Sequence, residues 1–281
     1  MSLTLGSGLT LAKTYVGIDD PDAANYIALV EAADTAAGSP GGLETATKVA
    51  IHSFVKGCKA DGIWTAIKAS CILAGARTLS GALVPLVGTA PTNNNFVSGD
   101  YNRKTGLVGD GSTKWLNTNR NNNADPQDSF HLSAWVSTAA TSGINDYPAY
   151  IGFDAIGLSK SGLSHIGRLN SNSTSLYVRA RMSAPSGESD ALVNQGAATG
   201  LVALSRASST TYTARAGQTN TVFTRTSATA QSGNIGVLYL QNTGTYSNGR
   251  VAFYSIGESL DLAKLDARVA NLITAFGAAI P

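Results

Sequence analysis

Short segments with alternating apolar and polar residues recur between residues 105 and 257, and they constrain the fold more than any other feature. The clearest is 175–182, whose even-numbered residues are apolar and whose odd-numbered residues are polar, Arg179 and Arg181 among them. A period of two turns one side of a strand toward a core and the other toward solvent. Further segments of this kind, separated by glycine, asparagine and serine turns, are Ser129–Ser137, Ala149–Phe153, Leu201–Arg206, Thr210–Ala216, Thr221–Thr226, Ile235–Gln241 and Arg250–Ile256. Such a series predicts a β-sandwich or barrel.

Helical periodicity is confined to the two ends of the chain. The first helix is expected to begin at Asp20, which is a good N-cap, with Pro21 at the first helical position. Glycine and proline then separate a second helix over about 43–57 from the first, and a third helix is expected over about 63–75. These three predict a small helical unit ahead of the strands.

The last helix carries one narrow apolar stripe with 3-4-3-4 spacing, formed by Leu262, Leu265, Val269, Leu272 and Phe276. Such a stripe closes a sandwich as a lid, or it forms a seam between subunits. The five residues are therefore candidate assembly contacts, although two heptads are short for a coiled coil.

The predicted fold class is mainly β with α: a helical unit, then a β-sandwich of the jelly-roll type, then a closing helix. We divide the chain into an extended arm at 1–18, a helical docking unit with its connector at 19–95, and the jelly roll with its C-terminal helix at 96–281.

Charged residues make up only 14% of the chain, well below the usual quarter. A low charge is typical of a β-sandwich and of surfaces that neighbouring protein molecules cover. The alternative is an ordinary monomer with a low charge. Arginines gather in 160–250, where they suit an acidic glycan, a phosphate or a partner chain, or else form a solvated sheet face. Arginine and lysine are not interleaved with exposed aromatic residues, so no nucleic-acid partner is expected. The sequence shows no signal peptide and no apolar run of membrane-spanning length, so we expect no membrane association.

Candidate catalytic and metal-binding residues are few. His52, His131 and His165 are the histidines, and they have no metal-ligand spacing. Cys58 and Cys71 are expected as buried free thiols. Jelly-roll glycosidases need paired carboxylates on one strand face, and the glutamates lie in predicted helices, a loop and a helix start. The loop 121–128 could gather calcium ligands, but solvated turn chemistry explains it as well. We therefore expect no enzyme activity, no cofactor and no metal.

Several blocks resemble known families. The glycine-rich run GLVGDGSTKWLN at 106–117, followed by FHLSAWV at 130–136, resembles the start of concanavalin-like jelly rolls. Segments that resemble tailed-bacteriophage structural proteins, cyanophage proteins among them, are FVKGCKADGIW at 54–64, AIKASCILAGARTL at 66–79, GALVPL at 81–86 and DYNRKTGLVGDGSTKW at 100–115. The ending FYSIGESL at 253–260 resembles the close of laminin-G-like jelly rolls in the same proteins.

The resemblance implies a non-enzymatic structural component of a phage virion, made in the host cytoplasm: a tail or fibre protein, or a head decoration. Its implied partners are copies of itself, with a trimer as one option, other virion proteins, and a host-surface glycan. The alternative is a carbohydrate-binding module or glycan depolymerase. Candidate platforms for stacking sugar rings, each of which packing in the core would also explain, are Trp115, Tyr147, Tyr150, Tyr212, Tyr239 and Tyr246.

Overall fold

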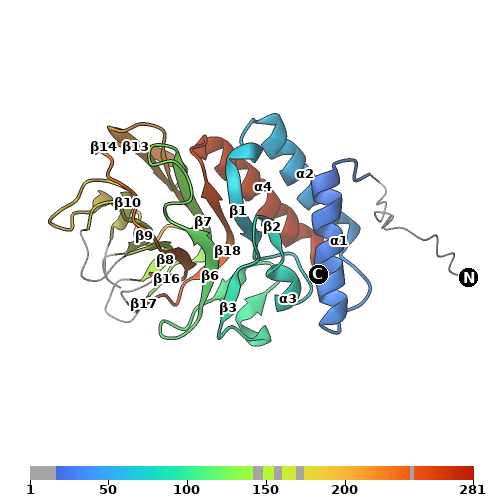
Figure 1. The fold of residues 1–281 in the computed structure, drawn as a ribbon. Helices are drawn as coiled ribbons and strands as arrows, with labels where there is room; N and C mark the ends of the chain where they lie inside the picture. The colour runs from blue at the N-terminus through green and yellow to red at the C-terminus, as the bar shows by residue number, and fades with distance from the viewer. Residues whose placement is uncertain (1–16, 142–147, 155–159, 169–173, 241–243) are drawn as a thin grey trace, which may run out of the picture.

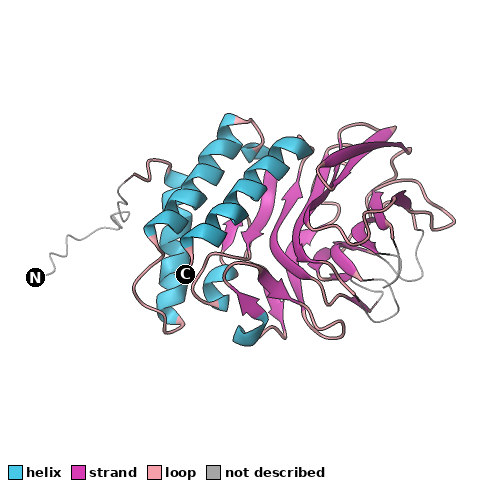
Figure 2. Ribbon diagram, turned by 180° about the vertical axis from the view of Figure 1, so that it is seen from behind, coloured by secondary structure: helices cyan, strands magenta, loops and turns pink. Residues whose placement is uncertain are grey.

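The computed structural model describes residues 17–141, 148–154, 160–168, 174–240 and 244–281. Its helices lie together on one side of two β-sheets, and the sheets pack face to face (Figure 1). Viewed from behind, the same separation of helices from strands is plain (Figure 2). The helical elements are α1 (Pro21–Ala36), α2 (Thr45–Ala60), η1 (Trp64–Ala66), α3 (Leu79–Ala82), η2 (Ser98–Asp100) and α4 (Leu262–Ala279).

All strand pairings in both sheets are antiparallel. The first sheet has, in spatial order, β14 (Thr219–Thr224), β13 (Thr211–Ala216), β12 (Gly200–Arg206), β7 (Phe130–Thr138), β18 (Arg250–Gly257), β1 (Ile67–Ile72) and β2 (Pro85–Val87), while β5 (Gly106–Val108) pairs with β18 and β4 (Tyr101–Asn102). The second has β11 (Asp190–Leu192), β10 (Leu176–Ala180), β9 (Ser164–Arg168), β8 (Ala149–Phe153), β15 (Asn234–Val237), β6 (Trp115–Asn121) and β3 (Thr92–Asn94). A separate hairpin joins β16 (Tyr239–Leu240) to β17 (Thr245–Tyr246).

Two hydrophobic cores hold these layers together. One lies between the sheets and contains the apolar side of β10, including Leu176 and Val178, as the alternation predicts. The other lies between the first sheet and the helices, where Phe54 of α2 meets Phe253 of β18 edge to face at 5.7 Å between ring centroids. The predicted fold class, a mainly β sandwich with N-terminal helices and a closing helix, is confirmed.

The capping signals of the sequence also hold. Asp20 accepts hydrogen bonds from the backbone N–H groups of Asp22 and Ala23, at 3.0 and 3.3 Å, and so begins α1. Asp261 caps α4 in the same way.

The apolar stripe of α4 is a lid, and the alternative role as an assembly contact is wrong. The side chains of Leu262, Leu265, Val269, Leu272 and Phe276 are all between 0% and 3% exposed, because they pack against the first sheet and α2. They are not available to a neighbouring subunit.

The predicted third helix is also wrong, because its centre is the strand β1. This strand lies between β18 and β2, and both of its faces are covered, one by the sandwich core and the other by the helices. A strand that is buried on both sides has a continuous apolar run, which periodicity alone does not separate from a helix. Residues 19–95 therefore contribute strands to both sheets and do not form a separate docking unit. Deleting residues 1–90 would remove β1 from the sheet.

The predicted strand over 235–241 is broken. It divides into β15 and β16 at Leu238, which has a left-handed backbone with φ of 60°.

Candidate functional site

The structure separates the six candidate stacking residues into three groups. Tyr150 and Tyr212 are buried in the sandwich core, at 0% and 2% exposure, and cannot stack on a ligand. Tyr147 lies outside the described residues. The remaining three, Trp115, Tyr239 and Tyr246, come together in one place and form the aromatic stack.

The aromatic stack is a continuous series of half-buried rings. The ring centroids of Trp115 and Tyr239 are 4.4 Å apart with planes tilted by 39°, and those of Tyr239 and Tyr246 are 4.6 Å apart with a tilt of 36°. These separations lie at the close end of the range for packed aromatic pairs. Because each ring supports the next, the stack presents a fixed apolar surface that loses little conformational freedom when a ligand binds.

A short loop holds Trp115 at the start of β6. The N–H groups of Gly109 and Gly111 donate to the carbonyls of Gly249 and Ser247, at 3.0 and 3.3 Å. A Cβ on Gly109 would lie 1.9 Å from the Ser247 carbonyl oxygen, so only glycine allows this close approach. The loop is thereby fixed to the segment that directly follows Tyr246.

Asp110 completes the turn before Trp115. Its carboxylate accepts hydrogen bonds from the backbone N–H groups of Ser112, Thr113 and Lys114, at 2.9, 2.7 and 3.0 Å. Burial alone would raise the pKa of Asp110, but these hydrogen bonds, with one from the Thr113 hydroxyl, outweigh burial and hold the pKa well below its usual value. Asp110 is therefore a structural carboxylate that stays ionised, not a proton donor.

The hairpin β16–β17 supplies the two tyrosines, which face each other directly in its register. Leu238 positions this hairpin: its left-handed backbone turns the chain between β15 and β16. Its N–H donates to the Tyr150 carbonyl at 2.8 Å, and its carbonyl accepts from the N–H of Ser247 at 3.1 Å. A left-handed conformation is unfavourable for leucine, and here these bonds and complete burial of the side chain maintain it.

Amide side chains border the stack on the outer face of the second sheet. Asn94 of β3 is the cross-strand neighbour of Trp115, and Asn117 lies two residues further along β6. Both positions share a sheet face with Trp115 because side chains alternate along a strand. Both are half-buried. Apolar rings bordered by amide groups provide the two kinds of contact, stacking and hydrogen bonding, that a sugar ring uses.

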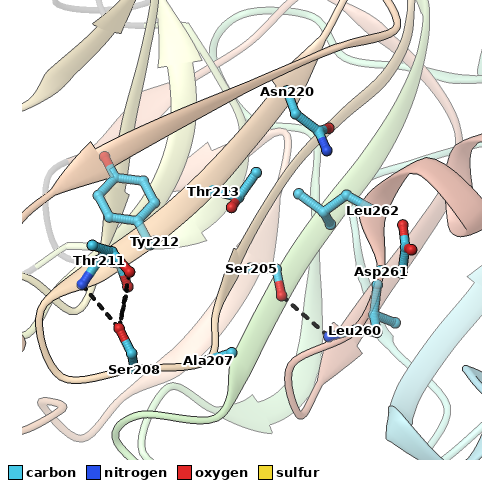
Figure 3. A pocket seen from close by; sticks show the side chains of 10 residues that line it. All are labelled: Ser205, Ala207, Ser208, Thr211, Tyr212, Thr213, Asn220, Leu260, Asp261 and Leu262. Carbon is cyan, nitrogen blue, oxygen red and sulfur yellow. Dashed lines mark hydrogen bonds between the residues drawn. The ribbon is translucent and has the colours of Figure 1, made fainter.

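A polar hollow of about 350 Å³ lies elsewhere, between β12, β13 and the beginning of α4 (Figure 3). Several of its polar groups are already hydrogen-bonded within the protein. The Ser205 hydroxyl accepts from the Leu260 N–H at 3.1 Å, Ser208 bonds with Thr211, and the Asp261 carboxylate caps α4. The ring of Tyr212 is in the core and not in the hollow. This hollow therefore has neither a stacking platform nor an uncommitted carboxylate.

The arginine-rich region is mainly internal, which neither sequence interpretation foresaw. Arg181 and Arg206 are fully buried. The Arg181 guanidinium lies 3.8 Å from the centroid of the Phe130 ring and donates to the carbonyls of Asn122, Asp125 and Pro126, the last two at 3.0 and 2.7 Å. These arginines fasten loops to the sandwich. The loop at 121–128 is held in this way, and two of the carbonyls that could have bound calcium are those of Asp125 and Pro126.

A serine–histidine pair does occur, but it is sealed inside the protein. His131 Nε2 is 2.7 Å from the Ser255 hydroxyl, and His131 Nδ1 is 2.6 Å from the Glu258 carbonyl. Both residues are 0% exposed beneath the helices. Burial lowers the pKa of His131 to about 4 and outweighs the opposing hydrogen bond to Glu258. These contacts and this burial give His131 a structural role.

Other chemistry is sparse in the described part of the chain. Its histidines, cysteines and carboxylates form no group of three or more that could hold a metal ion. Cys58 and Cys71 are buried free thiols, as predicted. None of the helices in the described ranges has the length and hydropathy needed to cross a bilayer.

Sequence reasoning found the three residues of the stack, but not their grouping. It missed Leu238 and Gly109, which position the rings. The glycine-rich run at 106–111 was the available signal for Gly109. No local pattern marks Leu238, because leucine rarely adopts a left-handed backbone.

No family model matches the sequence, and no curated protein sequence matches it. Solved structures do match. The binding domain of botulinum neurotoxin serotype D is 12% identical over 73% of this chain and 51% of that chain, with a TM-score of 0.48. A Trypanosoma rangeli sialidase is 10% identical over 75% of this chain and 33% of its own, with a TM-score of 0.44. This chain thus spans about half of the toxin domain and a third of the sialidase. These likenesses concern the fold and assign no function.

Proposed function

We propose that this protein is a non-catalytic glycan-binding β-sandwich whose ligand stacks on Trp115, an end ring of the aromatic stack, with Tyr239 and Tyr246 packed behind it. The observation that carries the proposal is the aromatic stack: three half-buried rings at centroid separations of 4.4 and 4.6 Å, on a sheet face that also carries Asn94 and Asn117.

The charges near the stack favour a neutral glycan. Lys114 precedes Trp115 directly, and its ammonium group is already paired with Asp100 at 2.6 Å. Arg250 lies near the same loop and donates to the Gly106 carbonyl at 2.6 Å. Both cations are therefore committed to the protein, and stacking with amide hydrogen bonds is left as the means of recognition.

The absence of catalysis is part of the proposal. The nearest carboxylate in sequence, Asp110, is ionised and fully engaged by backbone N–H groups, so it does not supply the protonated acid that a glycosidase requires.

The test is a glycan array followed by calorimetry on the neutral oligosaccharides that bind. Trp115→Ala should weaken binding by about tenfold, which corresponds to about 1.4 kcal/mol, the upper part of the range for one aromatic contact. Trp115→Phe should retain most of the affinity. Trp64→Ala is the matched control, because Trp64 is also half-buried but packs in the helical layer. A full array without binding, or equal affinities for Trp115→Ala and Trp64→Ala, would refute the assignment.

We propose, as a second function, a structural role in a tailed-phage particle as a tail, fibre or head-decoration protein. It rests on the resemblance of the blocks within 54–115 and 253–260.

One surface also favours assembly: a hollow of about 470 Å³ between α1 and the edge strand β2, where Leu29 is 48% exposed and Trp64 and Val87 are half-buried. Leu29→Asp should leave thermal unfolding unchanged and abolish incorporation into particles. Normal incorporation of this variant would exclude this hollow as an assembly surface.

A further inference from the structure

The groove between α2 and α4 is an apolar depression of about 680 Å³. The two helices lie side by side on the outside of the molecule (Figure 1). Its walls are apolar and small, which is why the helices leave a gap; they include Ala46, Val49, Ala50 and Phe54 of α2 and Leu272 and Ala275 of α4. Val49 is 44% exposed at its rim. An apolar groove of this kind is costly to leave in water.

One end of the groove is closed. Arg268 of α4 crosses to α2 and pairs with Asp61 at 2.7 and 2.9 Å. Its guanidinium lies against Gly57, where a Cβ would approach it to 2.7 Å. A segment that occupies the groove must therefore enter from the side or from the end near Thr45.

The described chain begins beside this groove. Ile18 is buried in the helical core, and the Asp19 carboxylate contacts His52 Nε2 at 2.5 Å and Lys56 Nζ at 2.8 Å, both on α2. His52 is three residues after Val49, so the two side chains leave α2 about 60° apart around the helix axis. The start of the described chain is consequently fixed on the surface of α2 near the groove.

The sequence ahead of Gly17 suits the groove in length and in chemistry. Five extended residues, 12–16, span about 16 Å, enough to cross the outer surface of α2, whose diameter is about 10 Å. Leu9, Thr10 and Leu11 precede these five residues in the sequence, and the segment 1–16 contains a single charged side chain, Lys13.

We propose that the chain's own N-terminal segment binds in the α2–α4 groove, with Leu9 and Leu11 against the alanine-lined walls. The occupant is in the same molecule because Asp19 fixes the segment at the groove, where its effective concentration exceeds that of any segment from a second copy at ordinary concentrations. This inference does not depend on glycan binding.

The test measures the accessibility of a thiol placed at the groove's rim in the full chain. Val49→Cys is labelled with a thiol reagent, while Cys58 and Cys71 stay silent because both are buried and burial raises the pKa of each to about 12. Adding Leu9→Ser and Leu11→Ser should speed labelling about fivefold or more. The two serines weaken binding of the segment, and the thiol reacts only while the groove is uncovered. Leu3→Ser with Leu5→Ser is the matched control and should change the rate little.

Two results would overturn the proposal. One is equal labelling rates in all three proteins. The other is protection that rises with protein concentration together with a dimer in sedimentation, because the segment would then come from a second copy. Protection that is independent of concentration in a monomer supports it.

Discussion

Burial of His131 without a charge makes a quantitative prediction about stability and pH. In the folded chain the imidazole donates from Nδ1 to the Glu258 carbonyl and accepts at Nε2 from the Ser255 hydroxyl. This arrangement uses the neutral tautomer. Because burial lowers the pKa of His131 from 6.5 to about 4, the unfolded chain binds a proton near pH 6 and the folded chain does not.

The sign follows from linkage. A histidine whose folded pKa is depressed contributes stability that is complete above pH 6.5 and is lost as the pH falls toward 4. Between pH 7 and pH 5 the two pKa values give a loss of about 2 kcal/mol from this one residue. His165 acts in the same direction, since burial lowers its pKa to about 3. Its contribution is present in every variant that keeps it and cancels when two such variants are compared.

The perturbation is His131→Gln, and the assay is urea unfolding at pH 7, 6 and 5. The variant should be less stable than the wild type at pH 7, because its hydrogen bonds and packing are poorer. The gap should narrow by about 2 kcal/mol by pH 5, because only the wild type loses the contribution of a neutral His131. Ser133→Ala is the control: it removes a buried hydroxyl that donates to the Ser255 carbonyl at 3.2 Å, and its effect should not vary with pH. A constant gap between wild type and His131→Gln across this range would refute the reasoning.

Three further outcomes follow from buried contacts. Arg181→Ala leaves three loop carbonyls without their donor and should cost about 3 kcal/mol or more in urea unfolding. Gly109→Ala, whose new Cβ would lie 1.9 Å from a backbone carbonyl oxygen, should cost about 2 kcal/mol and also weaken glycan binding, whereas Gly99→Ala, with no atom within 4 Å, should be neutral in both assays. Cys58 and Cys71 should both resist a thiol reagent in the native protein and react fully in denaturant; rapid native labelling of either would contradict their burial.

The parts of the fold that the sequence predicted are those decided by local periodicity. Alternation located half of the strands in the two sheets, which are β7, β12, β13, β14 and β18 in the first sheet and β8, β10 and β15 in the second. The N-cap Asp20 and the apolar stripe of α4 could be predicted for the same reason, because each depends on residues that are close together in the sequence. The strand β1 escaped because its neighbours cover both faces, so its apolar run carries no period of two.

The buried arginines show where local reasoning stops. Alternation placed Arg179 and Arg181 on the face opposite the core. Arg179 of β10 has that place, but the face is not solvated. Arg181 follows the end of β10 with a left-handed backbone, and its guanidinium packs against Phe130 of the sandwich core. Arg179 is 5% and Arg181 0% exposed, because loops close over them and supply carbonyl acceptors, Gly187 for Arg179 and the distant Asp125 for Arg181. A buried cation whose acceptors are mainly backbone carbonyls needs no complementary acidic residue, so the sequence carries no sign of its burial.

The aromatic stack has one aspect that the sequence predicts and one that it does not. Its residue types were visible, but their grouping depends on contacts between segments more than 120 residues apart, the loop 106–114 and the hairpin β16–β17. Leu238 links the local sequence to this grouping, since its left-handed backbone decides on which side of the sheet Tyr239 lies. A leucine in that conformation costs about 1–2 kcal/mol relative to an ordinary strand residue. The structure offsets this with a buried side chain and two backbone hydrogen bonds. Because the same contacts maintain the turn and align the rings, the orientation of the platform is fixed before any ligand arrives.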